Sequence, residues 1–298
     1  MKSKILIILF ISLFINGYSQ KIDTNKFVYS NSLFFKISKE GNKKLIIYLH
    51  GGVRNPYFKQ NNDDIKLSYV IENNYSFIQS AMENGYDLLI PVKNDSLNWI
   101  TDPNKCWNVF KKYLNTTNTK YSKLYIGGES DGGTGSYKIF YDNNDSFSGL
   151  IVFNGYPQYN SFYTTVDYSK VTNKKVLFLS TKSDNRIPYE FLLTEYCKQK
   201  KYNADTYLYV PEGEHTFSAY QKTDFDLIFD ILKTDKDNTL KIPVHGFVRH
   251  DTLIEFYPYR KKIIRKFYWG KEFYEINKQQ KKLIKTNKNF EITIFKEK

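Results

Sequence analysis

Short apolar runs alternate with segments of helical spacing along most of the chain. Buried strands are predicted at 45–49, 86–92, 124–126, 150–153, 176–179 and 206–210, where each run is almost continuously apolar. Helices are predicted at 69–83, 104–114, 135–141, 188–198 and 224–232, and a weaker leading strand at 30–38. This alternation predicts an α/β fold with a mainly parallel central sheet and helices on both faces.

The pattern changes near residue 238. Alternating apolar and polar positions predict strands within 248–257, 262–269, 272–276 and 290–295. From Lys241 onward there are 15 Lys and Arg against 6 Asp and Glu, an excess of nine within a net charge of +13. We therefore expect a larger domain at 20–237 and a small antiparallel β-rich appendage at 238–298. The appendage is either a structural brace or a docking surface for an anionic partner.

The first nineteen residues have the layout of a secretory signal peptide. Lys2 and Lys4 precede an apolar run at 5–15, and Gly17 and Ser19 place small residues just before Gln20. A membrane-spanning helix needs about 20 apolar residues, so this run is too short to be a stable anchor. We expect export to the periplasm or the extracellular space after cleavage, without stable membrane insertion.

Composition excludes several other classes of protein. Two cysteines, Cys106 and Cys197, are too few for a disulfide framework, and we expect both to be unpaired. The positive charge comes with no helix-turn-helix, zinc-finger or base-stacking motif, so nucleic-acid binding is not expected. Hydrophobic residues make up 41% of the chain, which is enough for a substantial core.

The segment 128–132 fits the pattern G-x-S-x-G around Ser130. It directly follows a predicted strand and precedes a predicted helix, the context in which a nucleophilic serine is held on a tight turn. A glycine-rich phosphate loop is the competing interpretation, but the lysine of G-x-x-x-x-G-K-[ST] is absent. Ser130 is therefore the candidate nucleophile.

A serine hydroxyl needs an adjacent base, and that base needs an orienting carboxylate. His215 lies in a loop between the last buried strand and the last helix, whereas His50 precedes the serine. Asp184 follows the strand 176–179, which gives the chain order Ser…Asp…His. The alternatives are an ordinary loop histidine and a turn carboxylate, and the rival acids are Asp205, Glu212 and Glu214.

Acyl transfer also needs two N–H donors for the negative charge that develops on the carbonyl oxygen. The backbone of Asp131, directly after the nucleophile, is expected to supply one donor. The loop after the strand 45–49 is expected to supply the other, with Gly52 preferred and Gly51 or Val53 as alternatives. The His50 side chain is expected to be structural.

The segments 49–52, 128–132, 184–188 and 213–215 resemble the corresponding pieces of α/β-hydrolases. They are most similar to the compact branch with dienelactone hydrolases, feruloyl and acetyl esterases and prolyl-oligopeptidase-like catalytic domains, over about residues 40–235. The resemblance implies a Ser130–Asp184–His215 triad, an acyl-enzyme intermediate and no metal or cofactor. The chain departs from the family in lacking a strong first strand pair, so we expect fewer than the usual eight strands.

The substrate is less determined than the mechanism. Arg54, Trp99, Asn154, Tyr156, Tyr159 and Tyr163 lie in loops expected near the mouth of the site and are candidate substrate contacts. The favoured function is exported serine esterase activity on a small or saccharide-linked ester. A serine peptidase is the first alternative, and an inactive binding module on a hydrolase scaffold is the second.

Overall fold

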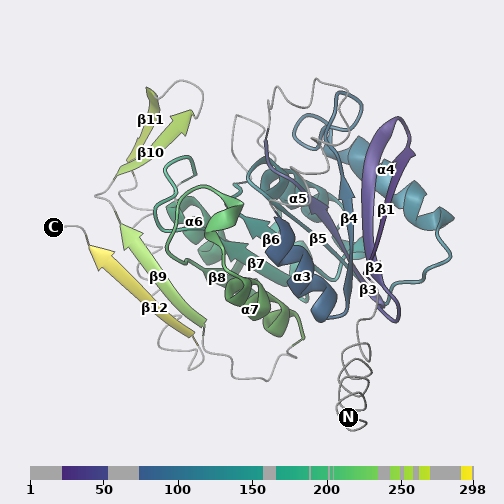
Figure 1. Ribbon diagram of the computed structural model, residues 1–298. Helices are drawn as coiled ribbons and strands as arrows, with labels where there is room; N and C mark the ends of the chain where they lie inside the picture. Colours follow the sequence, from purple (N-terminus) through teal and green to yellow (C-terminus); the bar gives the residue numbers. More distant parts are fainter. Residues whose placement is uncertain are drawn as a thin grey trace, which may run out of the picture.

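The computed structural model describes residues 22–52, 74–156, 166–187, 189–200, 202–203, 205–233, 242–248, 252–257, 262–268 and 290–296. Its main feature is an eight-stranded sheet in the order β1-β2-β4-β3-β5-β6-β7-β8 (Figure 1). The strands are β1 (Ile22–Tyr29), β2 (Ser32–Lys39), β3 (Lys44–Leu49), β4 (Tyr86–Pro91), β5 (Lys123–Glu129), β6 (Gly149–Phe153), β7 (Lys175–Leu179) and β8 (Thr206–Tyr209). Neighbours from β4 across to β8 are parallel, which confirms the predicted sheet.

The first two strands form an antiparallel hairpin at one edge of the sheet, and β2 pairs antiparallel with β4. Ser30 and Asn31 make the turn with positive φ angles of 49° and 61°, the twist that two-residue hairpins favour. The expectation of fewer than eight strands is wrong. Strand β1 was missed because it is an edge strand with a largely polar sequence, so it carries no clear apolar pattern.

Helices cover both faces of the sheet (Figure 1). They are α3 (Tyr75–Glu83), α4 (Pro103–Thr116), α5 (Asp131–Asp142), α6 (Tyr189–Lys200) and α7 (Lys222–Lys233), with short 3-10 turns η3 (Asn144–Ser146), η5 (Tyr168–Val171) and η6 (Phe217–Ala219). Phe77 of α3 packs on Phe225 and Phe229 of α7, with ring centroids 5.4 and 5.9 Å apart. Tyr137 of α5 donates a hydrogen bond to the buried Glu195 of α6. These contacts join neighbouring helices on each face.

The C-terminal strands are β9 (Ile242–Val248), β10 (Thr252–Tyr257), β11 (Lys262–Tyr268) and β12 (Phe290–Lys296). Strands β10 and β11 pair antiparallel as expected, but β9 and β12 pair parallel. Apolar alternation does not encode pairing direction, and here the parallel partners are distant in sequence. The strand predicted at 272–276 lies outside the described residues. The boundary at 237 and the docking role stay predictions.

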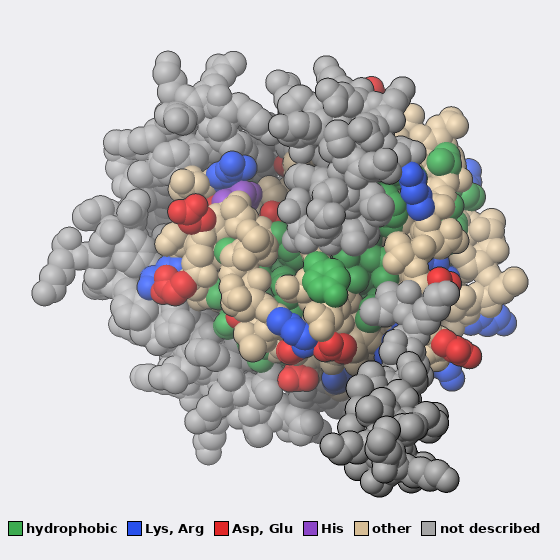
Figure 2. Space-filling view, in the orientation of Figure 1, with side chains coloured by type: hydrophobic (Ala, Val, Ile, Leu, Met, Phe, Trp, Pro, Cys, Tyr) green, Lys and Arg blue, Asp and Glu red, His purple; other side chains and the backbone are tan. Residues whose placement is uncertain are grey.

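On the face drawn in Figure 2, Lys and Arg side chains of the described residues are interspersed with Asp and Glu, so charge of one sign does not dominate that face. Lys222, for example, pairs with both Glu83 and Asp226. Within the described residues, no helix is long and apolar enough to cross a membrane. Residues 1–19, the predicted signal peptide, lie outside the described part of the chain.

Candidate active site

Ser130 sits on a sharp turn between β5 and α5. Its φ and ψ are 52° and −116°, a region that non-glycine residues rarely adopt. The backbone holds it there: the Ser130 N–H donates to the Phe153 carbonyl at 2.8 Å, and the Thr134 N–H donates to the Ser130 carbonyl at 2.9 Å. The turn therefore fixes the direction of the hydroxyl before any substrate arrives.

Close approach of α5 to β3 makes this turn possible. A Cβ atom on Gly132 would lie 1.8 Å from the Leu49 carbonyl oxygen and 2.8 Å from that of His50. No side chain fits in that space, so glycine is required. The second glycine of the motif thus brings the nucleophile against the loop that follows β3.

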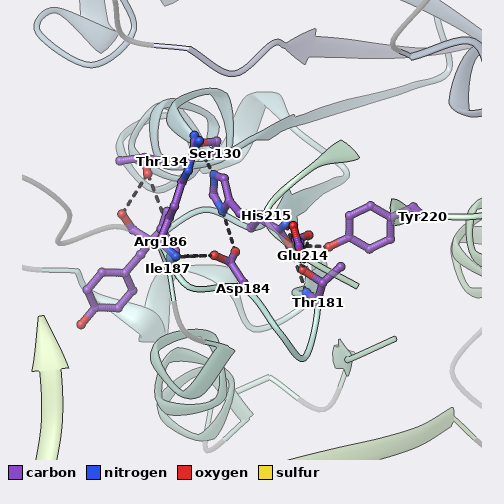
Figure 3. Close-up of polar contacts among 11 residues, drawn as sticks. Ser130, Thr134, Thr181, Asp184, Arg186, Ile187, Glu214, His215 and Tyr220 are labelled. Atoms are coloured by element: carbon purple, nitrogen blue, oxygen red, sulfur yellow. Dashed lines mark hydrogen bonds and ion pairs between the residues drawn. The ribbon is translucent and has the colours of Figure 1, made fainter. Parts of the chain in front are cut away.

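His215 links the serine to a carboxylate (Figure 3). Its Nε2 lies 3.0 Å from Ser130 Oγ, and its Nδ1 lies 2.6 Å from Asp184 Oδ2. The bond to a carboxylate assigns the proton to Nδ1 and leaves Nε2 to accept the serine proton. The three side chains, singled out by motif and chain order, therefore lie in one hydrogen-bonded row.

Asp184 is held in a turn just after β7. Its Oδ1 accepts the backbone N–H groups of Arg186 at 2.9 Å and Ile187 at 2.8 Å, which leaves Oδ2 for His215. The rival acids lie elsewhere. Glu212 pairs with Lys182 at 2.7 Å, and Glu214 accepts a bond from Thr181 at its backbone carbonyl. Asp205 precedes β8 and lies at the amino ends of the parallel strands, whereas Asp184 follows the carboxyl end of β7.

His50 anchors the loop after β3. Its ring is buried, donates from Nδ1 to the Gly51 carbonyl at 2.8 Å, and accepts at Nε2 the backbone N–H of Lys93 at 3.1 Å. Burial lowers the pKa of His50 to about 4, and nearby Lys93 adds to the effect. A neutral ring with both nitrogens engaged is a structural anchor, in keeping with the role expected for it.

The candidate oxyanion donors differ in availability. The Gly51 backbone lies against the Glu129 carboxylate and lowers the pKa of that carboxyl group, against the larger effect of burial, so the Gly51 amide is the less available donor. The Gly51 carbonyl points to His50, and a planar trans peptide directs the Gly52 N–H the opposite way. Gly52 has φ 94°, which glycine adopts without strain. Asp131 begins α5, where the first N–H groups lack intrahelical partners. Among the described candidates, Gly52 and Asp131 therefore stay the predicted donors, and Val53 lies outside the described residues.

Sequence reasoning missed Lys93 at this site, and it considered only the backbone of Asp131, not its side chain. Lys93 and Asp131, 6% and 3% exposed, form an ion pair of 3.3 Å, and Lys93 Nζ also lies 3.4 Å from the Gly52 carbonyl oxygen. Burial lowers the pKa of Lys93 and raises that of Asp131, and their mutual attraction opposes both shifts. Burial also raises the pKa of Glu129 to about 7, despite the charge of nearby His215. The sequence offered only the position of Lys93 shortly after β4, at the end of the sheet where the site lies, and nothing that marks its burial.

Two of the predicted substrate contacts are wrong. Trp99 is fully buried, packs against Gly135 and stands edge-on to His50 at 5.1 Å, so it serves the core beneath the site. Asn154 is also fully buried, and its Oδ1 accepts bonds from Tyr220 Oη at 2.5 Å and from the Thr181 N–H at 3.2 Å. Their loops fold inward, because these side chains satisfy partners inside the protein.

The remaining predicted substrate contacts are not contradicted by the structure and stay predictions. Tyr156 is half-buried and packs on Phe191 with ring centroids 4.5 Å apart, while its backbone bonds to the Thr134 hydroxyl. Arg54, Tyr159 and Tyr163 lie outside the described residues. Cys106 is buried and unpaired, and the Cys197 side chain is not described. The described part of the chain has no His, Cys, Asp and Glu cluster suited to a metal ion.

Comparison with solved structures places the fold. An esterase from Pyrococcus furiosus aligns over 72% of this chain and 93% of its own, with a TM-score of 0.54 and 12% identity. S-formylglutathione hydrolase from Staphylococcus aureus aligns over 72% and 98%, with a TM-score of 0.55 and 14% identity. Acylaminoacyl peptidase from Pyrococcus horikoshii aligns over 74% of this chain and 42% of its own, with a TM-score of 0.52 and 16% identity.

At the level of sequence, no family model and no curated protein matches the chain. Identities of 12–16% to the three structures support likeness of fold only. The strand order, the position of Ser130 after β5 and these neighbours agree with one another. The chain therefore has the fold of the α/β-hydrolase superfamily.

Proposed function

We propose that this chain is an exported serine hydrolase that cleaves carboxylic esters through an acyl-enzyme. The observation that carries the proposal is the row Asp184–His215–Ser130, with bonds of 2.6 and 3.0 Å. A serine, a neutral imidazole and a buried carboxylate in this order are what nucleophilic acyl transfer requires. A binding module on a hydrolase scaffold has no need to keep all three groups in register.

Each group has a defined role in the proposed reaction. Ser130 Oγ attacks the ester carbonyl while His215 Nε2 takes its proton, and Asp184 stabilises the imidazolium that forms. The Gly52 and Asp131 N–H groups stabilise the oxyanion. His215 then gives its proton to the leaving alcohol, which leaves an acyl group on Ser130. Water, deprotonated by His215, attacks that acyl group, and His215 then returns the proton to Ser130 Oγ as the carboxylic acid leaves.

The share of each solved structure that aligns with this chain supports ester cleavage rather than peptide cleavage. The likeness spans 93% of an esterase and 98% of an S-formylglutathione hydrolase, but only 42% of an acylaminoacyl peptidase. The esterase and the S-formylglutathione hydrolase are thus matched along nearly their whole length. A serine peptidase stays the alternative function, because the same row of side chains can cleave either bond.

A substrate panel distinguishes these functions. The purified chain is assayed with p-nitrophenyl acetate, p-nitrophenyl butyrate and a feruloyl ester, beside aminoacyl p-nitroanilides, with Ser130→Ala as the control. We expect turnover of the esters alone, and none by the variant. Faster cleavage of the nitroanilides would establish the peptidase alternative. Binding of an ester without any hydrolysis would favour the inactive scaffold.

Export is tested separately. Lys2 to Gln20 carries the charge, apolar run and small-residue cleavage site on which this part of the proposal rests. Expression of the full chain in a bacterial host with cell fractionation should yield mature protein beginning at Gln20 outside the cytoplasm. Recovery of uncleaved cytoplasmic protein would contradict export and leave the hydrolase proposal standing.

A further inference from the structure

Lys93 is a buried cation that touches both sides of the candidate oxyanion hole. Its Nζ lies 3.3 Å from Asp131 Oδ2 and 3.4 Å from the Gly52 carbonyl oxygen. Asp131 follows the nucleophile, and Gly52 belongs to the loop after β3. The two candidate donors come from segments almost 80 residues apart in the sequence, and this one side chain contacts both residues.

The backbone of Lys93 reaches the same loop by a second route. Its N–H donates to His50 Nε2 at 3.1 Å, and His50 Nδ1 donates to the Gly51 carbonyl at 2.8 Å. Because the peptide is planar, holding the Gly51 carbonyl fixes the direction of the Gly52 N–H. Lys93 therefore holds this loop at two points: its backbone acts through His50 on the peptide that carries the Gly52 N–H, and its side chain lies 3.4 Å from the carbonyl oxygen of the following peptide.

The energetics of a buried charge make this arrangement informative. Removing an ammonium and a carboxylate from water is costly, and the ion pair at 3.3 Å need not recover that cost. Replacing a buried ion pair by apolar side chains of similar volume is often neutral or stabilising, so a purely structural role does not call for these two charges. Unlike an apolar side chain, the ammonium offers three N–H donors, so it can bridge a carboxylate and a carbonyl.

We propose that Lys93 is a positioning residue that holds the Gly52 loop and the start of α5 in register, so that both oxyanion donors aim at one point. This inference rests on the proposed hydrolase function. Lys93 takes no proton and contacts no reacting atom. It acts on the transition state through the two backbone segments, because small displacements of such donors have large effects on rate.

The test compares Lys93→Met with wild type on p-nitrophenyl acetate, and measures the affinity of each for a phenyl-substituted trifluoromethyl ketone. The bound ketone carries an oxyanion, so its affinity reports the hole directly. We expect kcat and ketone affinity to fall together by about 10- to 100-fold, with KM changed by less than about threefold. Lys222→Met is the matched control, since it removes only exposed ion pairs and should change neither value.

A second variant separates positioning from simple charge neutralisation. Lys93→Met alone leaves Asp131 buried without its partner, which can itself disturb folding. Lys93→Met/Asp131→Asn removes both charges and keeps the Asp131 backbone N–H. We expect it to fold, by circular dichroism and urea unfolding, and still to show the loss in kcat and ketone affinity.

Three results have distinct meanings. Wild-type kcat in the double variant would overturn the positioning role, because Lys93 would then only neutralise Asp131. Unchanged kcat in Lys93→Met would overturn it as well. If the wild-type chain neither hydrolyses esters nor reacts at Ser130, the proposed function itself fails, and that outcome is visible before any Lys93 variant is measured.

Discussion

The candidate site has two halves that are built on different principles. The acid–base half, Ser130, His215 and Asp184, is joined by direct bonds between reactive side chains at 3.0 and 2.6 Å. The proposed oxyanion half, Gly52 and Asp131, would offer backbone N–H groups, and His50 and Lys93 contact the segments that carry them. The first half depends on which functional groups are present, whereas the second depends on the direction in which two backbone N–H groups point.

This difference predicts two kinds of mutational response. Removing a group from the acid–base half removes a chemical step, so the loss should be very large at unchanged stability. Disturbing the oxyanion half should misdirect donors without deleting them, so the loss should be graded and often accompanied by a change in stability. The following variants test that contrast, from the largest expected effect to the smallest.

His215→Ala should have the largest effect. It leaves Ser130 without a base, and we expect kcat on p-nitrophenyl acetate to fall by about 10⁴-fold or more, with the urea midpoint close to wild type. Steady-state kinetics and urea unfolding of the purified variant check both parts. A loss below about tenfold would mean that another group activates the serine.

Asp184→Asn tests the orienting carboxylate. The amide keeps the shape, but it favours the wrong imidazole tautomer, so we expect kcat to fall by about 10³- to 10⁴-fold. Glu212→Gln is the control, because Glu212 forms only an exposed ion pair with Lys182 and should leave kcat unchanged. Equal effects of the two substitutions would contradict the assignment of Asp184.

Gly132→Ala tests the contact between the halves. Its Cβ would fall 1.8 Å from the Leu49 carbonyl oxygen, so α5 must move away from the loop after β3. We expect a loss of stability of about 1–3 kcal/mol, together with a fall in kcat of about 10- to 100-fold. Gly41→Ala, at φ 89° with nothing within 4 Å, should also lose stability but keep wild-type kcat. Equal kcat in both variants would show that this contact does not set the geometry.

Glu129→Gln is expected to have the smallest effect of these variants on kcat. Its main consequence should be a change in how stability depends on pH. Burial raises the pKa of Glu129 from 4.5 to about 7, so the folded state binds more protons than the unfolded state between these values. Wild-type stability should therefore fall, relative to Glu129→Gln, as pH rises from about 4.5 through 7, and the difference should then level off. Urea unfolding at pH 4, 6 and 8 measures this difference. A constant difference across the three pH values would contradict the raised pKa.

Much of the fold was accessible from sequence because its signals are local. The buried strands β3 to β8 are apolar runs, and the turn carrying Ser130 has a motif between a strand and a helix. Chain order and position after strands then singled out Asp184 and His215. In each case, one short segment contained the information needed.

Features that depend on distant contacts were not accessible. The edge strand β1 is mostly polar, and pairing with β2 rather than burial defines it. The Lys93–Asp131 pair joins residues 38 positions apart, and no local pattern marks a lysine that will be buried. Trp99 and Asn154 looked like rim residues, but partners from other segments hold both inside the protein.

The nucleophile assignment is tested most directly by covalent labelling. The wild-type chain is treated with a fluorophosphonate probe, digested and analysed by peptide mass spectrometry. The account predicts one probe per chain on the peptide that contains Ser130, no labelling of Ser130→Ala, and greatly slowed labelling of His215→Ala. Ester hydrolysis with Ser130 unlabelled, or with the probe on another residue, would contradict the account.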